Sequence, residues 1–432
     1  MTDNEAECQR LRREDQPDIM TSSPRDKYFS TYILFYTLGM ISQMPSNFFI
    51  TANSYWMYKF RNTSIPFDPH EKEKKDLQAT FTSNFSIVAN VVSFAFIIIT
   101  VKFAKKISVS TRIIGSLCAE MVLFMITIVF VNVNSDSWQY GFYIFTLITG
   151  VLLNGSSAVC LISAFQLSSK FPQAYVAAQL TGQSVCGIFA ALIQILALTN
   201  GIERVIPNAF IYFSTALLAI LATLMFYGYK KRYSEFFNYY ENLEVQTQNT
   251  GLPFSKENVL RVLKKMKFLL FSMIFIQGGT IIIHPGLTAN VVSVGEDSKW
   301  NTTFFVPVIT YLMYNICDFA GREASLRIKQ PTNDKILFIL STLRLILIPL
   351  LMLCNAQPRH HTSVVFNSDT CYIIFMFIFA ITNGYLFNLT ITALPSVITL
   401  EEKKIGFTVL ICVLVVSLAC CAMLNSAVLK II

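Results

Sequence analysis

Charge is scarce in this chain: of its 432 residues only 14% are charged, while 53% are hydrophobic. A soluble chain of this length usually carries about a quarter charged residues. The hydrophobic residues form long blocks rather than the short repeats of soluble strands and helices, which is typical of lipid-facing helices. The composition therefore excludes a soluble globular protein and predicts an all-α protein that crosses a membrane many times.

Motifs of enzymes and metal sites are missing as well. The chain has four histidines but no HExxH, and it has neither GxSxG nor a P-loop to cradle phosphate. Most of its ten cysteines lie in apolar blocks, where a thiol is a small hydrophobe. Cys354 and Cys371 flank one outer loop, where free thiols are favoured over a disulfide. We expect no enzyme, no ATP-driven pump, no metal, no cofactor, no nucleic acid and no obligate protein partner, which leaves a carrier or, as an alternative, a channel or receptor.

Eleven apolar blocks are long enough to cross a bilayer, which takes about 20 helical residues. They lie near 29–56, 79–101, 113–133, 139–168, 174–200, 206–229, 268–292, 303–325, 336–356, 370–396 and 406–429. The first 28 residues have no apolar core, so the first span is expected to act as its own insertion signal. The predicted organisation is a cytosolic tail (1–28), six helices (29–229), a basic cytosolic loop (230–267) and five helices (268–432).

Lysine and arginine set the expected orientation. With the N-terminus inside, 23 of these residues fall in inside segments and nine in outside segments. Positive charge accumulates on the cytosolic side of membrane proteins, so we expect a cytosolic N-terminus and an extracellular or lumenal C-terminus. The glycosylation sequons at Asn62 and Asn301 then both fall in outside loops.

The central loop ends in a basic amphipathic stretch, residues 258–267. Such a stretch is either a positive-inside anchor or a grip for anionic lipid on the cytosolic leaflet. The anchor is favoured, and both readings stay open.

Five ionisable residues lie where the bilayer should be. They are Glu120, His284, Asp318, Arg322 and Arg344. A charge at the bilayer centre costs at least a few kcal/mol, so each needs a partner or a wet cavity. Asp318 and Arg322 are four residues apart, hence on one helix face, and Asn315 lies one turn before them. This face is either a grip for a polar solute or an ion pair that locks two helix bundles together, whereas Glu120 and Arg344 are expected to neutralise charges within the protein.

Proline marks three expected interruptions, at Pro45 in the first span, Pro285 in the seventh and Pro395 at the end of the tenth. A proline inside a span frees a backbone carbonyl for another partner. Breaks in the first helix of each half suggest a central pathway between two bundles.

Several stretches, in order along nearly the whole chain, resemble the equilibrative nucleoside transporters. They are 38–52 with Pro45-Ser46-Asn47, 112–117, Gly182-Gln183, the run Asn315-Ile-Cys-Asp318-Phe-Ala-Gly321-Arg322, 353–359, and Asn383-Gly384-Tyr385-Leu386. The resemblance implies a major-facilitator-like arrangement of eleven helices in a six-plus-five split. It also implies downhill movement of nucleosides, and in some members nucleobases, by alternating access.

The resemblance also implies a set of substrate-binding residues. Asp318 and Arg322 would contact the ribose or base with Asn315 beside them, and the other wall residues would be Gln43, Ser46, Asn47, Asn90, Ser163, His284 and Tyr311. This chain departs from the family pattern in places. Ser46 stands where the family has tryptophan, Ser184 where it has glycine, and His284 where it has an aromatic residue.

Local stretches of the sequence bear on the membrane in which the protein resides and on whether its transport depends on pH. Stretches 55–62, 137–138 and 299–307 resemble the lysosomal branch of that family, which is pH-sensitive. We therefore expect a plasma membrane or endolysosomal location, with pH dependence assigned to His284 or Glu120. The alternatives are a carrier of another small polar solute and a degenerate carrier that acts as a membrane interaction protein.

Overall fold

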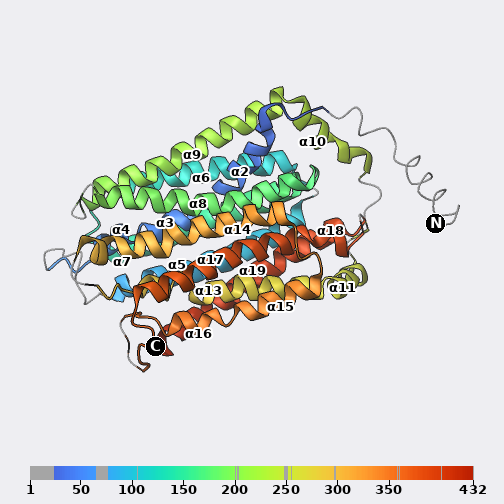
Figure 1. Ribbon diagram of the computed structural model, residues 1–432. Coiled ribbons are helices and arrows are strands. Elements are labelled where there is room, and N and C mark those ends of the chain that lie inside the picture. The colour runs from blue at the N-terminus through green and yellow to red at the C-terminus, as the bar shows by residue number, and fades with distance from the viewer. Residues whose placement is uncertain are drawn as a thin grey trace.

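The computed structural model describes residues 24–64, 76–104, 106–199, 201, 204–247, 252–253, 255–295, 298–357, 359, 361–399 and 401–431. Most of the predicted N-terminal tail and parts of the central loop lie outside these residues. The helices of the described chain run side by side along one direction (Figure 1).

The helices fall into two sets along the chain. The first half comprises α2 (Ser30–Ile41), α3 (Met44–Thr51), α4 (Asn53–Lys59), α5 (Asp76–Phe103), α6 (Val109–Asn132), α7 (Gln139–Ser168), α8 (Gln173–Thr199) and α9 (Val205–Tyr233). The second half comprises α12 (Lys267–Met273), η3 (Ile274–Gly278), α13 (Gly279–Ile283), η4 (Thr288–Asn290), η5 (Trp300–Phe304), η6 (Val306–Met313), α14 (Tyr314–Ile328), α15 (Asp334–Arg344), α16 (Leu347–Met352), α17 (Asp369–Thr392), α18 (Leu394–Val397) and α19 (Lys403–Ile431).

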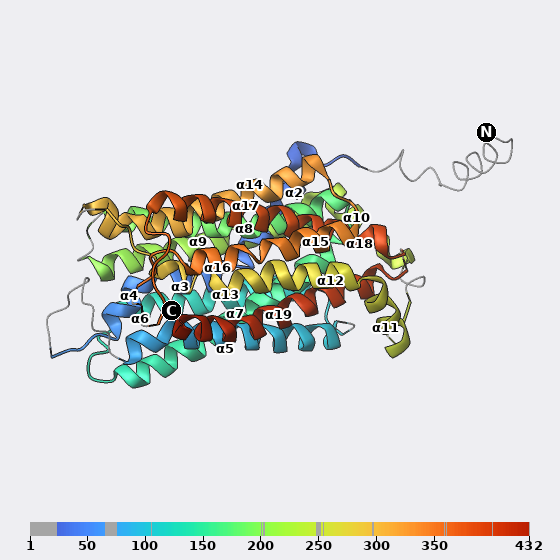
Figure 2. The ribbon, with the colours of Figure 1, turned by 60° about the horizontal axis from the view of Figure 1, so that its bottom comes forward.

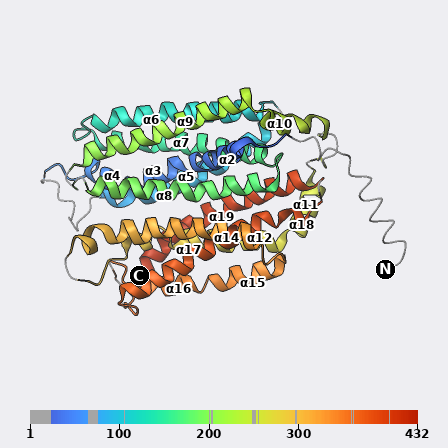
Figure 3. The ribbon, with the colours of Figure 1, turned by 45° about the horizontal axis from the view of Figure 1, so that its top comes forward.

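Two short helices, α10 (Glu235–Thr247) and α11 (Lys256–Lys265), connect the halves at one end of the bundle. We call this end the α11 end and the opposite one the α4 end (Figure 2). The connections from α5 to α6, α7 to α8 and α14 to α15 also lie at the α11 end. Figure 3 shows the helices of the first half grouped on one side of the bundle and those of the second half on the other.

Eight helical stretches of the described chain are long and apolar enough to span a membrane. The other three predicted spans correspond to α2–α4, α5 and η5–α14. The first is broken into short helices, and the last carries Asp318, Arg322, Glu323 and Arg327, which lower its hydropathy. The fold is thus an all-α multi-pass bundle that is consistent with the eleven predicted crossings.

Helix breaks occur at the predicted prolines. α2 ends at Ile41, and α3 begins three residues later, at Met44, with Pro45 in its first turn. α13 ends at Ile283, directly before His284-Pro285, and α18 begins with Leu394-Pro395. Proline is tolerated in the first turn of a helix, because the backbone N–H groups there have no partner within the helix and the lack of one costs no hydrogen bond.

Buried apolar side chains form three clusters. One lies entirely within residues 34–237 and another within 283–380. The third joins the halves, because Ile97 and Leu180 of the first pack with residues such as Leu269 and Leu410 of the second. The two halves therefore have cores of their own and share a third.

Candidate functional site

Gly384 lets α14 and α17 touch at the level of Asp318. A Cβ built on Gly384 would lie 1.9 Å from the carbonyl oxygen of Asp318. Only glycine permits such a close approach of two backbones. The contact places Asp318, which is 3% exposed, inside the protein.

Three side chains donate hydrogen bonds to the Asp318 carboxylate. Arg322 Nε lies 2.9 Å from Oδ2, and Asn383 Nδ2 lies 2.7 Å from Oδ1. The third donor is the Ser184 hydroxyl of α8, which bonds to Oδ2. A buried carboxylate is tolerated when it is paired and its remaining lone pairs are satisfied. Here α14 and α17 supply two of the donors, and the other half of the protein supplies the third.

Arg322 also contacts both halves. Its Nη1 donates to the Leu180 carbonyl oxygen of α8 at 2.5 Å, and its guanidinium carbon lies 4.6 Å from the centre of the Phe387 ring. Asp318 and Arg322 form an i,i+4 ion pair, as their spacing predicts. The pair is charge-neutral and is hydrogen-bonded to its own half and across to the other.

A chain of neutral polar groups leads from Asp318 to Arg344. Asn383 Oδ1 accepts a hydrogen bond from Thr280 Oγ1 at 2.7 Å, and Arg344 Nη2 donates to the same hydroxyl at 2.9 Å. Arg344 also donates to the carbonyl oxygens of Ile276 and Phe379. Arg344 takes part in none of the ion pairs within the described chain. It therefore forms no direct ion pair there; its guanidinium bonds to two backbone carbonyls and the Thr280 hydroxyl, and its Nε has no hydrogen-bond partner among the described residues.

Asn315, Tyr311 and His284 lie on the α4 side of Asp318. Asn315 Nδ2 donates to the Tyr311 carbonyl oxygen at 2.8 Å, and the Asn315 side chain fills the space beside Gly187 of α8. The His284 ring stacks on Tyr314 with centroids 3.9 Å apart, and its Nδ1 lies 2.9 Å from Thr288 Oγ1. The predicted aromatic wall is thus a histidine–tyrosine stack, with Tyr311 6.3 Å from the histidine ring.

The predicted residues of the first half surround the break between α2 and α3. Gln43 precedes α3, and its carbonyl oxygen accepts from Asn47 Nδ2 at 3.0 Å. Ser46 Oγ donates to Asn154 Oδ1 of α7 at 2.5 Å. Ser46, which stands where the resembling family has tryptophan, therefore links α3 to α7 by a hydrogen bond.

Ser163 and Glu120 of the first half are buried polar groups. Within the described chain, the Ser163 hydroxyl and both carboxylate oxygens of Glu120 have no hydrogen-bond partner, and both residues are 0% exposed. Glu120 takes part in none of the ion pairs there, so it does not neutralise a charge as expected. The remaining predicted residue, Asn90 of α5, is half-buried.

Sequence reasoning missed Ser184, Thr280 and Glu323 as contact residues. A hydroxyl in an apolar block, such as that of Ser184 or Thr280, carries no signal comparable to that of a charge, whereas Glu323 is a charge close to the end of the predicted span 303–325. Asn383 appeared only as part of a family motif. Asp318 and Arg322 are in direct contact, and Asn315 contacts Tyr311, whereas several predicted residues bond to partners outside the predicted set.

Additional hydrogen bonds join the halves toward the α11 end. Tyr36 of α2 donates to Glu323 of α14 through its hydroxyl. Gln173 Nε2 donates to the Thr392 carbonyl oxygen at 2.6 Å. These contacts lie between Asp318 and the α11 end, so any opening of the halves toward that end must break them.

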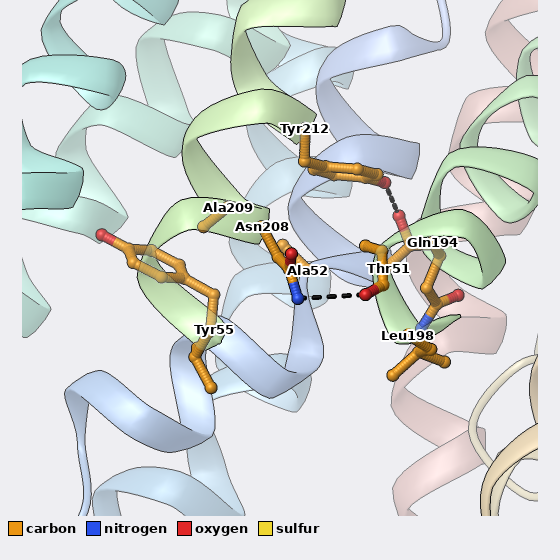
Figure 4. A pocket seen from close by; sticks show the side chains of 10 residues that line it. Thr51, Ala52, Tyr55, Gln194, Leu198, Asn208, Ala209 and Tyr212 are labelled. Carbon is orange, nitrogen blue, oxygen red and sulfur yellow. Dashed lines mark hydrogen bonds between the residues drawn. The ribbon is translucent and has the colours of Figure 1, made fainter. Parts of the chain in front are cut away.

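A cavity with an empty volume of about 470 Å³ lies elsewhere, toward the α4 end of the first half. Figure 4 shows Tyr55, Asn208 and Tyr212 around it, with the Tyr212 hydroxyl bonded to Thr51. None of the predicted binding residues lines this cavity. It is separate from the polar site at Asp318.

Comparison with known proteins gives a consistent result. A family model described as nucleoside transporter matches residues 147–253 and 246–430. Equilibrative nucleoside transporter 3 of Rattus norvegicus is 28% identical, over 95% of this chain and 92% of that protein. Equilibrative nucleoside transporter 1 of Homo sapiens is 30% identical, over 89% of this chain and 94% of that protein.

Solved structures of similar fold are carriers. The major facilitator superfamily transporter FucP in its outward conformation matches with a TM-score of 0.51 and 12% identity, over 92% of this chain and 97% of that one. A POT family transporter in complex with 5-aminolevulinic acid matches with a TM-score of 0.55 and 14% identity, over 92% and 90%. At this identity the likeness establishes the fold alone, which is that of the major facilitator transporters.

Proposed function

The chain belongs to the nucleoside transporter family, and from this premise we propose that it carries nucleosides down their gradient by alternating access. The observation that carries the proposal is the Asp318–Arg322 pair, which is buried, charge-neutral and hydrogen-bonded across the boundary between the halves. A pair of this kind offers both an acceptor and a donor to a neutral polar solute. The proposed substrates are nucleosides such as uridine and adenosine.

The contacts of the pair suggest how a solute would bind. Ser184 and the Leu180 carbonyl belong to α8, whereas Asn383 belongs to the same half as Asp318. When the halves separate, the two α8 partners leave, which frees an acceptor position on Asp318 and a donor on Arg322. A ribose hydroxyl can then donate to Asp318, and a base carbonyl or ring nitrogen can accept from Arg322. The solute thus replaces the two hydrogen bonds between the halves.

Closure on one side follows from the bonds near the α11 end. Tyr36 with Glu323, and Gln173 with the Thr392 carbonyl, hold the halves together there. We assign these contacts to the gate that opens when solute leaves toward the α11 end. Residues 29–229 and 268–432 are the two moving bundles of this proposal.

Orientation is assigned from charge. The predicted inside segments, rich in Lys and Arg, lie at the α11 end, so we place that end in the cytosol. Asn62, which is exposed, and Asn301 then lie on the extracellular or lumenal side as glycosylation sites. A plasma membrane or endolysosomal location is compatible with this orientation.

Dependence of transport on pH is assigned to Glu120 or His284. Glu120 is supported by its burial without a hydrogen-bond partner among the described residues. Uptake should be measured across pH 5–8 in Glu120→Gln and His284→Phe variants. An unchanged profile in both variants would remove both assignments.

Uptake of labelled uridine and adenosine into cells that lack their own nucleoside carriers tests the proposal. We expect saturable uptake above vector controls that reaches equal concentrations on both sides. No gain over vector at acidic or neutral pH, with the protein shown to be in the membrane, would refute the proposed function.

A further inference from the structure

Helix α11 has one face that packs against the second half. Val262 is fully buried on this face, and Met266, directly after the helix, is fully buried too. Lys265 Nζ lies 2.8 Å from Glu402 Oε1, just before α19. The N–H of Leu252, shortly before α11, donates to the Glu401 carbonyl oxygen at 3.3 Å. The helix is therefore held at both of its ends.

The other face of α11 is exposed and basic. Lys256, Leu260 and Lys264 are spaced by four residues, so they lie on one face of α11, and Lys267 opens α12 after the break at Met266. All four are exposed, and Leu260 is 54% exposed. Together with Arg261 and a single acid, Glu257, this side of the helix has a net positive charge.

The position of α11 at the end of the bundle is suited to contact between its exposed basic face and a membrane surface. Figure 2 shows α11 at the end of the bundle, running across the direction of the long helices rather than along them. A helix that lies in the plane of a membrane surface buries an apolar side chain among the acyl chains and extends lysines to the headgroups. The exposed leucine among lysines at the end of the spans fits that placement.

We propose that the Lys256–Leu260–Lys264 face of α11, together with Lys267 at the start of α12, binds anionic phospholipid headgroups of the cytosolic leaflet. The chemical partner is a lipid phosphate with net negative charge, such as phosphatidylserine. The assignment to the cytosolic leaflet rests on the orientation proposed above, whereas the binding itself does not. Because Lys265 bonds Glu402 on the opposite side, the lipid-binding lysines remain free of that ion pair.

A tryptophan at position 260 gives a direct test in the full-length protein. The three native tryptophans, Trp56, Trp138 and Trp300, all lie at the α4 end. Proteoliposomes of Leu260→Trp protein would contain brominated phosphatidylserine or brominated phosphatidylcholine at equal mole fraction, and the native signal would be subtracted with the unsubstituted chain. We expect stronger quenching by the serine lipid, with at least threefold enrichment around position 260. Equal quenching by the two lipids would overturn the proposal.

Two variants that each lose four positive charges distinguish a lipid-binding site on α11 from a general attraction of anionic lipid to the positively charged end of the protein. The test variant combines Lys256→Gln, Arg261→Gln, Lys264→Gln and Lys267→Gln. The control combines Lys102→Gln, Lys106→Gln, Arg232→Gln and Lys335→Gln, which removes the same charge from exposed residues at the same end. Each basic side chain near a lipid surface strengthens binding about fivefold. The test variant should lose the enrichment and the control should keep it, and equal loss in both would overturn the proposal.

Native mass spectrometry of the unsubstituted chain with added phosphatidylserine or phosphatidylcholine provides a check that involves no tryptophan. We expect preferential retention of the serine lipid, and equal retention would contradict the proposal. The vesicles carry the same lipids in both leaflets, so neither measurement depends on insertion orientation or on transport. Failure of the lipid site and failure of the proposed carrier function are therefore distinguishable.

Discussion

The Ser184 hydroxyl of α8 donates a hydrogen bond to the Asp318 carboxylate of α14, across the boundary between the two halves. Ser184 stands where the resembling family pattern has glycine, a residue with no side chain to make this bond. It occupies an acceptor position that the proposed cycle gives to the solute. In the proposed cycle the serine would compete with the substrate for Asp318.

Replacing Ser184 by glycine should strengthen substrate binding. A hydrogen bond to a charged group contributes about 1.5–3 kcal/mol, and its loss frees Asp318 for a ribose hydroxyl. We expect the KM for uridine to fall about tenfold in Ser184→Gly. Thr181→Val is the matched control, because among the described residues the Thr181 hydroxyl bonds to the Ala177 carbonyl oxygen of its own helix and to no group of the other half. A KM that stays the same in Ser184→Gly would show that the serine does not compete.

Asp318 and Arg322 should be required for transport beyond their role in packing. Asp318→Asn leaves the Arg322 guanidinium buried without its counter-ion, which costs about 3–5 kcal/mol of stability. The double variant Asp318→Asn with Arg322→Gln removes both charges and should recover most of that stability. We expect uptake to remain below a tenth of wild type in the double variant, measured with thermal unfolding of the purified protein. Recovery of uptake together with stability would identify the pair as a structural lock.

Thr280 should position Asn383 beside Asp318. Thr280→Val has nearly the same shape but leaves Asn383 Oδ1 without its donor, while Arg344 Nη2 keeps the Phe379 carbonyl oxygen as its acceptor. An unsatisfied buried polar group costs about 1–3 kcal/mol, so we expect a lower unfolding temperature and a raised KM. Thr280→Ser restores the hydroxyl and should restore both. If the serine variant behaves like the valine variant, the hydroxyl is not what matters at this position.

Acid should weaken the attachment of α11. The Lys265 ammonium beside Glu402 lowers the pKa of that carboxyl below its ordinary value. Because the folded pKa lies below the unfolded value, the stabilisation is complete above about pH 4.3 and is lost as pH falls through the folded pKa. Lys265 is 40% exposed, so we expect only about 0.2–1 kcal/mol.

Thermal unfolding of wild type and Glu402→Gln between pH 7 and pH 3 checks this effect. The wild type should be the more stable at pH 7, and the two should converge as the pH falls. A difference that stays constant over this range would show that the Glu402 charge contributes nothing.

Much of the fold could be predicted from the sequence because a helix that crosses a bilayer must be composed mostly of apolar residues. A span requires about 20 apolar residues, and the prolines at 45, 285 and 395 lie at observed helix breaks. The i,i+4 contact of Asp318 with Arg322 followed from helix geometry alone.

The partners of Asp318 could not be predicted in the same way. Ser184 and Asn383 are both distant from Asp318 in sequence, and the contact of Asn383 with Asp318 accompanies the close approach of α17 to α14 at Gly384. Arg344 was expected to neutralise another charge, but within the described chain it forms no ion pair and instead donates to the backbone carbonyls of Ile276 and Phe379. Local sequence carries no signal for such contacts between helices.

Exchange in proteoliposomes tests the central claim most directly. Purified wild-type chain and the Asp318→Asn/Arg322→Gln double variant would be reconstituted into vesicles preloaded with unlabelled uridine, and entry of external labelled uridine would be followed. For wild type we predict transient counterflow that internal uridine accelerates, with no accumulation at equilibrium. The double variant should show neither effect. Absence of counterflow in folded wild type, or equal counterflow in the double variant, would contradict the account of Asp318 and Arg322 as the nucleoside site.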